Sequence, residues 1–165
     1  MNTEEALQFL RENQPLPPDD QLDDRIKTFE EVRQFFEEHI DPRCLELLLN
    51  AFGDGSGFGV YQLVEDTIRM YPPDLVVPIL QRTLCSPSHS VRYWNAQVAE
   101  YFSHESLVEP LARMLEEEDP DLRWAAATAL WPYDTPEKQT ILREHLQHET
   151  DEELRGVILE DLGET

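Results

Sequence analysis

Few residues in this chain have the types and spacing of a catalytic or metal site. Of its five histidines, only His145 and His148 are spaced so that they could share one face of a helix. Neither has a cysteine or a third ligand nearby in the sequence, and zinc sites use three or four protein ligands. Carboxylate pairs are frequent, but 35 acidic residues produce such pairs by chance. We therefore expect surface or helix-capping histidines, no metal or other cofactor, and no enzymatic activity.

Four glycines, Gly53, Gly55, Gly57 and Gly59, stand at alternate positions in a segment that superficially resembles a phosphate-binding loop. Such a loop follows a strand, precedes a helix and usually contains a lysine. The segment contains no basic residue, and no alternating β-branched run precedes it. We expect a flexible turn between two helices.

The elements that must position any functional residue recur along the chain. Residues 122–130 form an alanine-rich helical pattern, and the helix-start signal Asp119-Pro120-Asp121 precedes it. Related segments begin at Val60, Val91 and Leu154, so the steps between the four segments are 31, 31 and 32 residues. A fixed period in this range is typical of stacked helical repeats.

The periodicity predicts a single helical-repeat domain over residues 1–165. Residues 1–40 are expected to form N-terminal capping helices at 3–13 and 22–39, joined by a Pro-rich linker. Thr3 is the expected N-cap of the first helix, and Pro78 and Pro110 are expected in first helical turns. Residues 41–162 are expected to form four helical hairpins, at 42–52 with 58–71, 75–84 with 91–102, 106–116 with 121–130, and 136–146 with 151–162.

The segment Leu122-Arg123-x-x-Ala126-Ala127-x-Ala129-Leu130 resembles the second helix of a HEAT repeat, in the short form of about 30 residues. A second match is Val91-Arg92-x-x-Asn95-Ala96-x-Val98-Ala99. The resemblance covers residues 41–162. It implies an all-α fold, an α–α superhelix or solenoid in which four HEAT-like hairpins stack beside N-terminal capping helices.

Arg92, Arg123 and Arg155 occupy one column of the repeat alignment. They could form an anion-binding row, or a structural ladder in which each arginine pairs with an acid at a neighbouring helix start. Guanidinium–carboxylate pairing suits the ladder, and the HEAT resemblance implies it as well. The acids expected as partners are Asp119, Asp121 and Asp151.

Glu65 aligns with Ala96, Ala127 and Leu159, a column expected to be interior. A carboxylate there must be paired, hydrogen-bonded, protonated or functional. The ordinary alternative is a rotated first repeat, or an ion pair with Arg69 one turn later.

Two further columns of the repeat alignment would place their side chains in rows along one face of the stack. If the second helices line a concave side, these rows build a groove with aromatic side chains at its centre and acids around it. Tyrosine and tryptophan in such a groove are candidate anchors for a protein partner. The alternative is that these aromatics, with Trp94 and Tyr133, pack between repeats. The expected partner-binding residues are Gln62, Glu65, Asp66, Tyr93, Gln97, Trp124, Thr128 and Trp131.

The chain is strongly acidic, with 13 Lys and Arg against 35 Asp and Glu and a net charge of −22. This charge disfavours nucleic acids and anionic membranes, and it attracts basic proteins, although it also serves solubility alone. The first residues contain no apolar run typical of a secretory signal, and no apolar stretch reaches membrane-spanning length. Cys44 and Cys85 fit reduced thiols, so we expect a cytoplasmic protein.

Three classes of function are compatible with these features. We favour a non-enzymatic module that binds a basic protein, because a stack offers broad surface and few convergent catalytic groups. The alternatives are a ligand-handling factor, since short HEAT-like repeats resemble those of phycobilin lyases, and a passive assembly adaptor. Residues 59–68, an apolar helix with an embedded glutamate, are similar to bacterial immunity proteins of HEAT-like fold. That resemblance implies inhibition of a basic toxin or nuclease.

Overall fold

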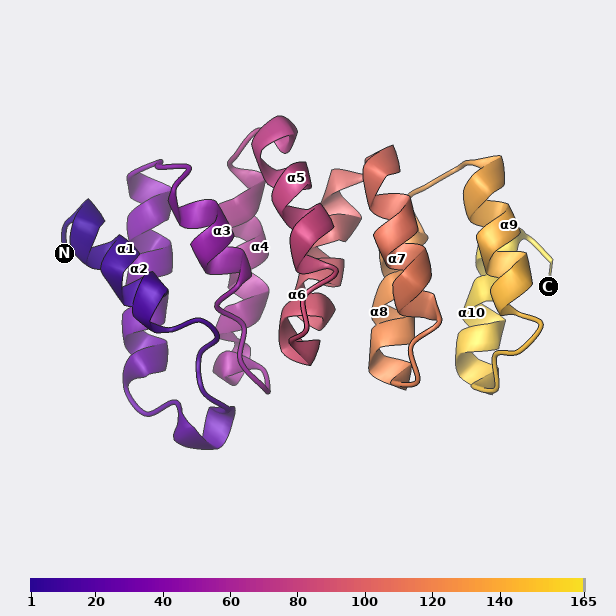
Figure 1. Cartoon of the computed structure of the whole chain (residues 1–165), viewed down its shortest axis with the longest axis horizontal. Coiled ribbons are helices and arrows are strands. Elements are labelled where there is room, and N and C mark those ends of the chain that lie inside the picture. The colour runs from indigo at the N-terminus through magenta and orange to yellow at the C-terminus, as the bar shows by residue number, and fades with distance from the viewer. Residues whose placement is uncertain (165) are drawn as a thin grey trace.

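The computed structural model describes residues 1–164, which form ten α-helices, a few 3₁₀ turns and no strand. The helices stand side by side in two layers, with the odd-numbered helices in one layer and the even-numbered helices in the other (Figure 1). This arrangement confirms the predicted all-α solenoid. The helices are α1 (Thr3–Glu12), α2 (Arg25–Glu38), α3 (Cys44–Leu49), α4 (Val60–Arg69), α5 (Pro73–Thr83), α6 (His89–Ala99), α7 (Val108–Leu115), α8 (Pro120–Leu130), α9 (Pro136–His145) and α10 (Glu152–Leu162).

The second helices of the last three hairpins, α6, α8 and α10, begin at positions that follow the sequence period. Ser88, Asp119 and Asp151 precede α6, α8 and α10, and each side chain accepts a hydrogen bond from a backbone amide of the first turn. These N-caps satisfy amides that have no partner inside the helix. The caps are 31 and 32 residues apart, so the period of the helices is also the period of their capping residues.

Small side chains in α8 allow close packing on two sides. Ala126 and Ala129 are fully buried, and Ala125 and Ala127 are buried as well. The helix packs against α7 of its own hairpin and against α6 of the preceding one. Close packing without voids is the main source of stability that such a stack can obtain from its repeats.

The N-terminal helices continue the two layers. Helix α1 packs against α3, and α2 packs against α4 (Figure 1). The α2 residues Phe29 and Phe36 are fully buried, as expected of an apolar stripe that seals the end of the stack. Arg33, also buried, donates to the Thr67 hydroxyl of α4 at 3.0 Å, so a polar link joins the terminal pair to the first repeat.

Two expectations about helix starts are wrong. Thr3 lies inside α1, and Asn2 is the N-cap, accepting a hydrogen bond from the Glu5 amide at 3.0 Å. Pro78 lies in the middle of α5 instead of its first turn, so one helical N–H is missing there. Pro110 is the third residue of α7 and therefore does lie in a first turn.

The glycine segment is held by the N-terminal linker. The carboxylate of Asp19 accepts hydrogen bonds from the amides of Ser56 and Gly57, both at 2.9 Å. At Gly53, a Cβ atom would stand 2.2 Å from the carbonyl oxygen of Leu16, closer than atoms approach. The segment joins α3 to α4, as the expected turn between two helices, and these contacts pack it closely against the linker. No helix within residues 1–164 is both long and apolar enough to cross a membrane.

Candidate functional site

Three adjoining hollows open between the second helices α4, α6 and α8, and we call them together the second-helix groove. They share residues with one another: Gln62 lines the first and second, Tyr93 the second and third, and Gln97 the first and third. Six of the eight residues that the sequence predicts to bind a partner line this groove. They are Gln62, Glu65, Tyr93, Gln97, Trp124 and Thr128.

The other two predicted residues lie elsewhere. Asp66 is exposed beside the groove, with its carboxylate 3.6 Å from the Arg69 guanidinium. Trp131 follows the end of α8 and is 45% exposed, but it lines none of the three hollows. Trp131 is seven residues after Trp124, about two helical turns, so it falls on the same face, but it comes after Leu130, the last residue of α8.

The aromatic residues divide between groove and core. Trp124 is half-buried, and its indole N–H donates to the Asp151 carboxylate at 3.2 Å, which fixes the ring at the groove wall. Tyr93 is also half-buried and meets Trp94 edge to face, with ring centroids 5.3 Å apart. Trp94 is only 7% exposed, and Tyr133 is buried, so both belong mainly to the core. The packing alternative therefore holds for Trp94 and Tyr133, whereas Tyr93 and Trp124 lie partly exposed at the groove.

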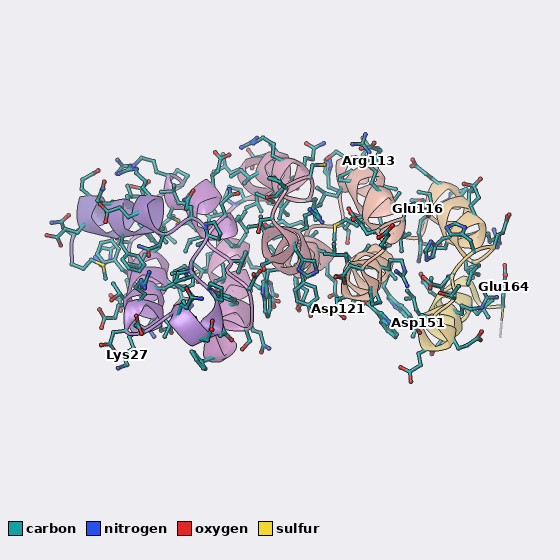
Figure 2. The ribbon with its side chains drawn as sticks, turned by 60° about the horizontal axis from the view of Figure 1, so that its bottom comes forward. Lys27, Arg113, Glu116, Asp121, Asp151 and Glu164 are labelled. Carbon is teal, nitrogen blue, oxygen red and sulfur yellow. The ribbon has the colours of Figure 1, made fainter. Side chains whose placement is uncertain are left out.

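The charges that line the groove have one sign. Glu65, Glu100 and Asp121 line the hollows, and no lysine or arginine is among the lining residues of the described chain. Asp121 and Asp151 lie along the same edge of the stack, at the starts of α8 and α10 (Figure 2). Carboxylates gathered in a hollow attract a cationic partner more strongly than the same charges spread over a convex surface.

Glu65 is not interior, because its side chain is 25% exposed at the edge of the groove. Partial burial raises the pKa of the carboxyl above its ordinary value, while the nearby Tyr101 hydroxyl opposes the rise. The Arg69 guanidinium is 3.8 Å away, so the ordinary pairing expected from the sequence is present but loose. The raised pKa means that the ionised carboxylate is incompletely compensated in the isolated chain.

The arginines of the aligned column link loops to the second helices through hydrogen bonds. Arg92 donates to the Ser86 carbonyl at 2.7 Å, and Arg155 donates to the Glu149 carbonyl at 3.0 Å. These bonds satisfy carbonyl groups in the turn before each second helix. Within the described residues, none of the three arginines forms an ion pair with the expected acids, Asp119, Asp121 and Asp151.

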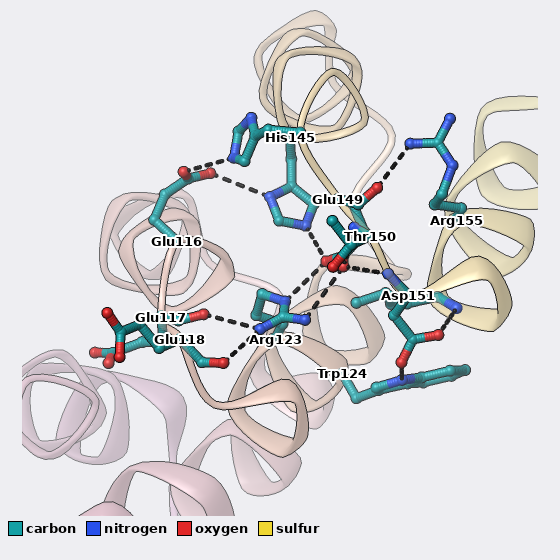
Figure 3. Close-up of polar contacts among 12 residues, drawn as sticks. Glu116, Glu117, Glu118, Arg123, Trp124, His145, Glu149, Thr150, Asp151 and Arg155 are labelled. Atoms are coloured by element: carbon teal, nitrogen blue, oxygen red, sulfur yellow. Dashed lines mark hydrogen bonds and ion pairs between the residues drawn. The ribbon is translucent and has the colours of Figure 1, made fainter.

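Arg123 joins the third repeat to the fourth (Figure 3). Its Nε and one terminal nitrogen donate to the two Glu149 oxygens, at 2.8 and 3.2 Å. Its other terminal nitrogen donates to the carbonyls of Glu117 and Glu118, at 3.1 and 2.8 Å. A planar guanidinium forms such a two-pronged contact with a carboxylate, which fixes geometry as well as charge.

Glu149 is the centre of this polar network, with a side chain only 1% exposed. It also accepts the amides of Thr150 and Asp151 at 2.8 Å, and it contacts His145 Nε2 at 2.8 Å. Burial by itself raises the pKa of Glu149, but the hydrogen bonds from Arg123, Asp151 and His145 lower it to about 2. Glu149 is therefore ionised at neutral pH.

Sequence reasoning missed two features of this network. His145 is 1% exposed, whereas a surface or capping histidine was expected. Glu117 and Glu149, the carboxylates nearest Arg92 and Arg123, are 32 residues apart. That step matches the repeat period, so it is the signal that would have identified these loop acids as the arginine partners.

Comparison with known proteins agrees with this architecture. The family model described as HEAT repeats matches residues 75–163, which is more than half of the chain. The matched region spans α5 to α10 and so includes two of the three helices around the groove. No curated protein matches the sequence.

Proposed function

Because this chain belongs to the HEAT-repeat family, we propose that it is a non-enzymatic protein-binding module that holds a basic protein segment in the second-helix groove. Solenoids of this kind commonly use their extended surfaces to bind other proteins. The observation that supports a basic partner is the negative charge of the groove. Glu65, Glu100 and Asp121 lie on its walls, and no lysine or arginine lines it among the described residues.

The groove also has the residue types of an interface centre. Trp124 and Tyr93 present half-buried rings between the carboxylates, and aromatic residues are enriched where interfaces are most strongly desolvated. A lysine or arginine of the partner would contact a carboxylate and an aromatic ring at once, which favours ion pairing together with cation–π contact.

A basic toxin domain is the partner implied by the sequence resemblance of residues 59–68 to immunity proteins. Helix α4, which covers most of that segment, supplies Gln62 and Glu65 to the groove. In this version of the proposal the groove would cover a cationic surface of the toxin. Co-expression with the toxin would then restore growth, and loss of groove carboxylates would abolish the rescue.

Removal of the groove charges tests the proposed function. We expect the variant Glu65→Gln, Glu100→Gln, Asp121→Asn to bind a partner captured from the source cells at least about tenfold more weakly than the unchanged chain. The affinity of the unchanged chain should fall as salt rises, and the variant should show a shallower salt dependence. Titration calorimetry with the purified partner at two salt concentrations measures both effects.

The matched control removes three exposed charges from first helices, by Asp74→Asn, Glu137→Gln and Glu144→Gln. Because the net charge changes equally, this control separates the groove from the overall acidity. Equal weakening by both triple variants would show that general charge attraction, and not the groove, determines binding.

A further inference from the structure

Three side chains with metal-binding atoms converge between the third and fourth repeats. Glu116 follows the last residue of α7, His145 ends α9, and His148 lies in the turn after it. The Glu116 carboxylate is 3.2 Å from His145 Nδ1 and 2.9 Å from His148 Nε2. One ligand atom from each residue lies within 4.8 Å of the others. The sequence did not suggest this cluster, because Glu116 is 29 residues before His145.

Glu149 contacts the His145 ring on the side away from Glu116 (Figure 3). His145 Nε2 is 2.8 Å from a Glu149 oxygen that also accepts the Nε–H of Arg123, so this oxygen acts as a hydrogen-bond acceptor. In a neutral imidazole the hydrogen is therefore on Nε2, and the Nδ1 lone pair points toward Glu116. Two acceptors then face each other at 3.2 Å, and either a proton or a metal ion placed between them would stabilise this contact.

The same contact is the usual support of a metal-binding histidine. Such a histidine donates its second ring N–H to a carboxylate, which fixes the ring and strengthens the metal-facing nitrogen as a ligand. Here Arg123 in turn holds Glu149 through two hydrogen bonds. His145 is thus oriented by a buried, rigid contact, while Glu116 and His148, each 56% exposed, are free to adjust around an ion.

We propose that Glu116, His145 and His148 bind one divalent transition-metal ion, with zinc the best match, and that the ion clips the third repeat to the fourth. Two imidazoles and one carboxylate form a ligand set that zinc accepts with a fourth position left to water. Magnesium and calcium prefer oxygen ligands and do not suit two histidines.

The observed spacing requires little movement. Two ligand atoms on one tetrahedral zinc are separated by roughly 3.3 Å, given metal–ligand bonds of about 2.0–2.1 Å. Glu116 Oε1 is 3.2 Å from His145 Nδ1, and Glu116 Oε2 is 2.9 Å from His148 Nε2. The remaining adjustment around one ion falls on the side chains of Glu116 and His148, which are exposed.

The test is titration of metal-free, full-length chain with zinc chloride at neutral pH, followed by calorimetry. We expect one ion per chain, and we expect His148→Ala and Glu116→Gln each to weaken binding by at least about tenfold. Zinc should also raise the melting temperature of the unchanged chain and leave that of His148→Ala unaffected. Cobalt in place of zinc should give the absorption of a tetrahedral site.

His104→Ala is the matched control, because His104 is exposed and its ring contacts Ser106, away from the cluster. This variant should bind zinc like the unchanged chain. Both ligand variants alter exposed side chains, and their circular dichroism should match that of the unchanged chain. Absence of zinc binding, or equal binding by the unchanged chain and both ligand variants, would overturn the proposal and leave only hydrogen bonds between Glu116 and the two histidines.

Discussion

Replacing Glu149 by alanine is expected to lower the free energy of unfolding by about 3–5 kcal/mol. The substitution leaves the Arg123 guanidinium, which is only 14% exposed, without its carboxylate. It also leaves the Thr150 and Asp151 amides and the ring of His145 without the same acceptor. A buried charge that loses its partner costs more than the pair contributes, so the effect should exceed that of a surface ion pair several-fold. Urea unfolding at pH 7 measures it.

Glu153→Gln is the matched control, since Glu153 is exposed in the first turn of α10 and should change stability by less than about 1 kcal/mol.

The same network should make the stability of the chain sensitive to acid. The pKa of Glu149 is about 2 in the folded chain and 4.5 ordinarily, so its contribution is complete above pH 4.5 and is lost as pH falls toward 2. Glu149→Gln should flatten that part of the pH profile. A cost below 1 kcal/mol for Glu149→Ala would contradict the network's importance.

Replacing Trp124 by alanine should weaken partner binding by about 2 kcal/mol or more, which corresponds to roughly 30-fold in affinity. Trp124 lines the groove beside Tyr93, and its ring is already oriented by the hydrogen bond to Asp151. A preoriented aromatic side chain loses little conformational entropy on binding, so most of its contact energy is retained. Calorimetric titration of the captured, purified partner gives the change directly.

Trp131→Ala provides the comparison for this prediction. Trp131 is the more exposed tryptophan, but it lies outside the groove, so its removal should leave affinity unchanged. If Trp131→Ala weakens binding as much as Trp124→Ala, the contact surface extends past the end of α8 and the groove is wrongly placed.

The fold could be predicted from the sequence because each repeat carries the same pattern of buried and capping residues. The apolar residues that open the four repeat segments recur at one period, and they are Val60, Val91, Leu122 and Leu154. The N-caps before α6, α8 and α10 have the same period. Individual ends are less predictable: the expected helix 42–52 is α3, Cys44–Leu49. The residues beyond it form a packed connection that depends on Asp19, a contact across 37 residues that no local pattern contains.

The groove could be predicted in outline, since six of the eight predicted residues do line it, five of them from two columns of the repeat alignment. Contacts between loops could not be predicted from the sequence. Glu116 and His145 meet only because the turns after α7 and α9 are neighbours in the stack, and the sequence period does not describe side chains outside the helices. Glu65 is the exception to its interior column, because α4 presents it at the edge of the groove beside Arg69, which fits the alternative that the sequence left open.

Hydrogen exchange of the chain with and without its bound partner tests the central claim most directly. The account predicts that binding slows exchange in α4, α6 and α8, the helices that line the groove, and leaves α5 and α9 unchanged. Protection confined to the first helices, with α6 and α8 exchanging as in the free chain, would contradict it.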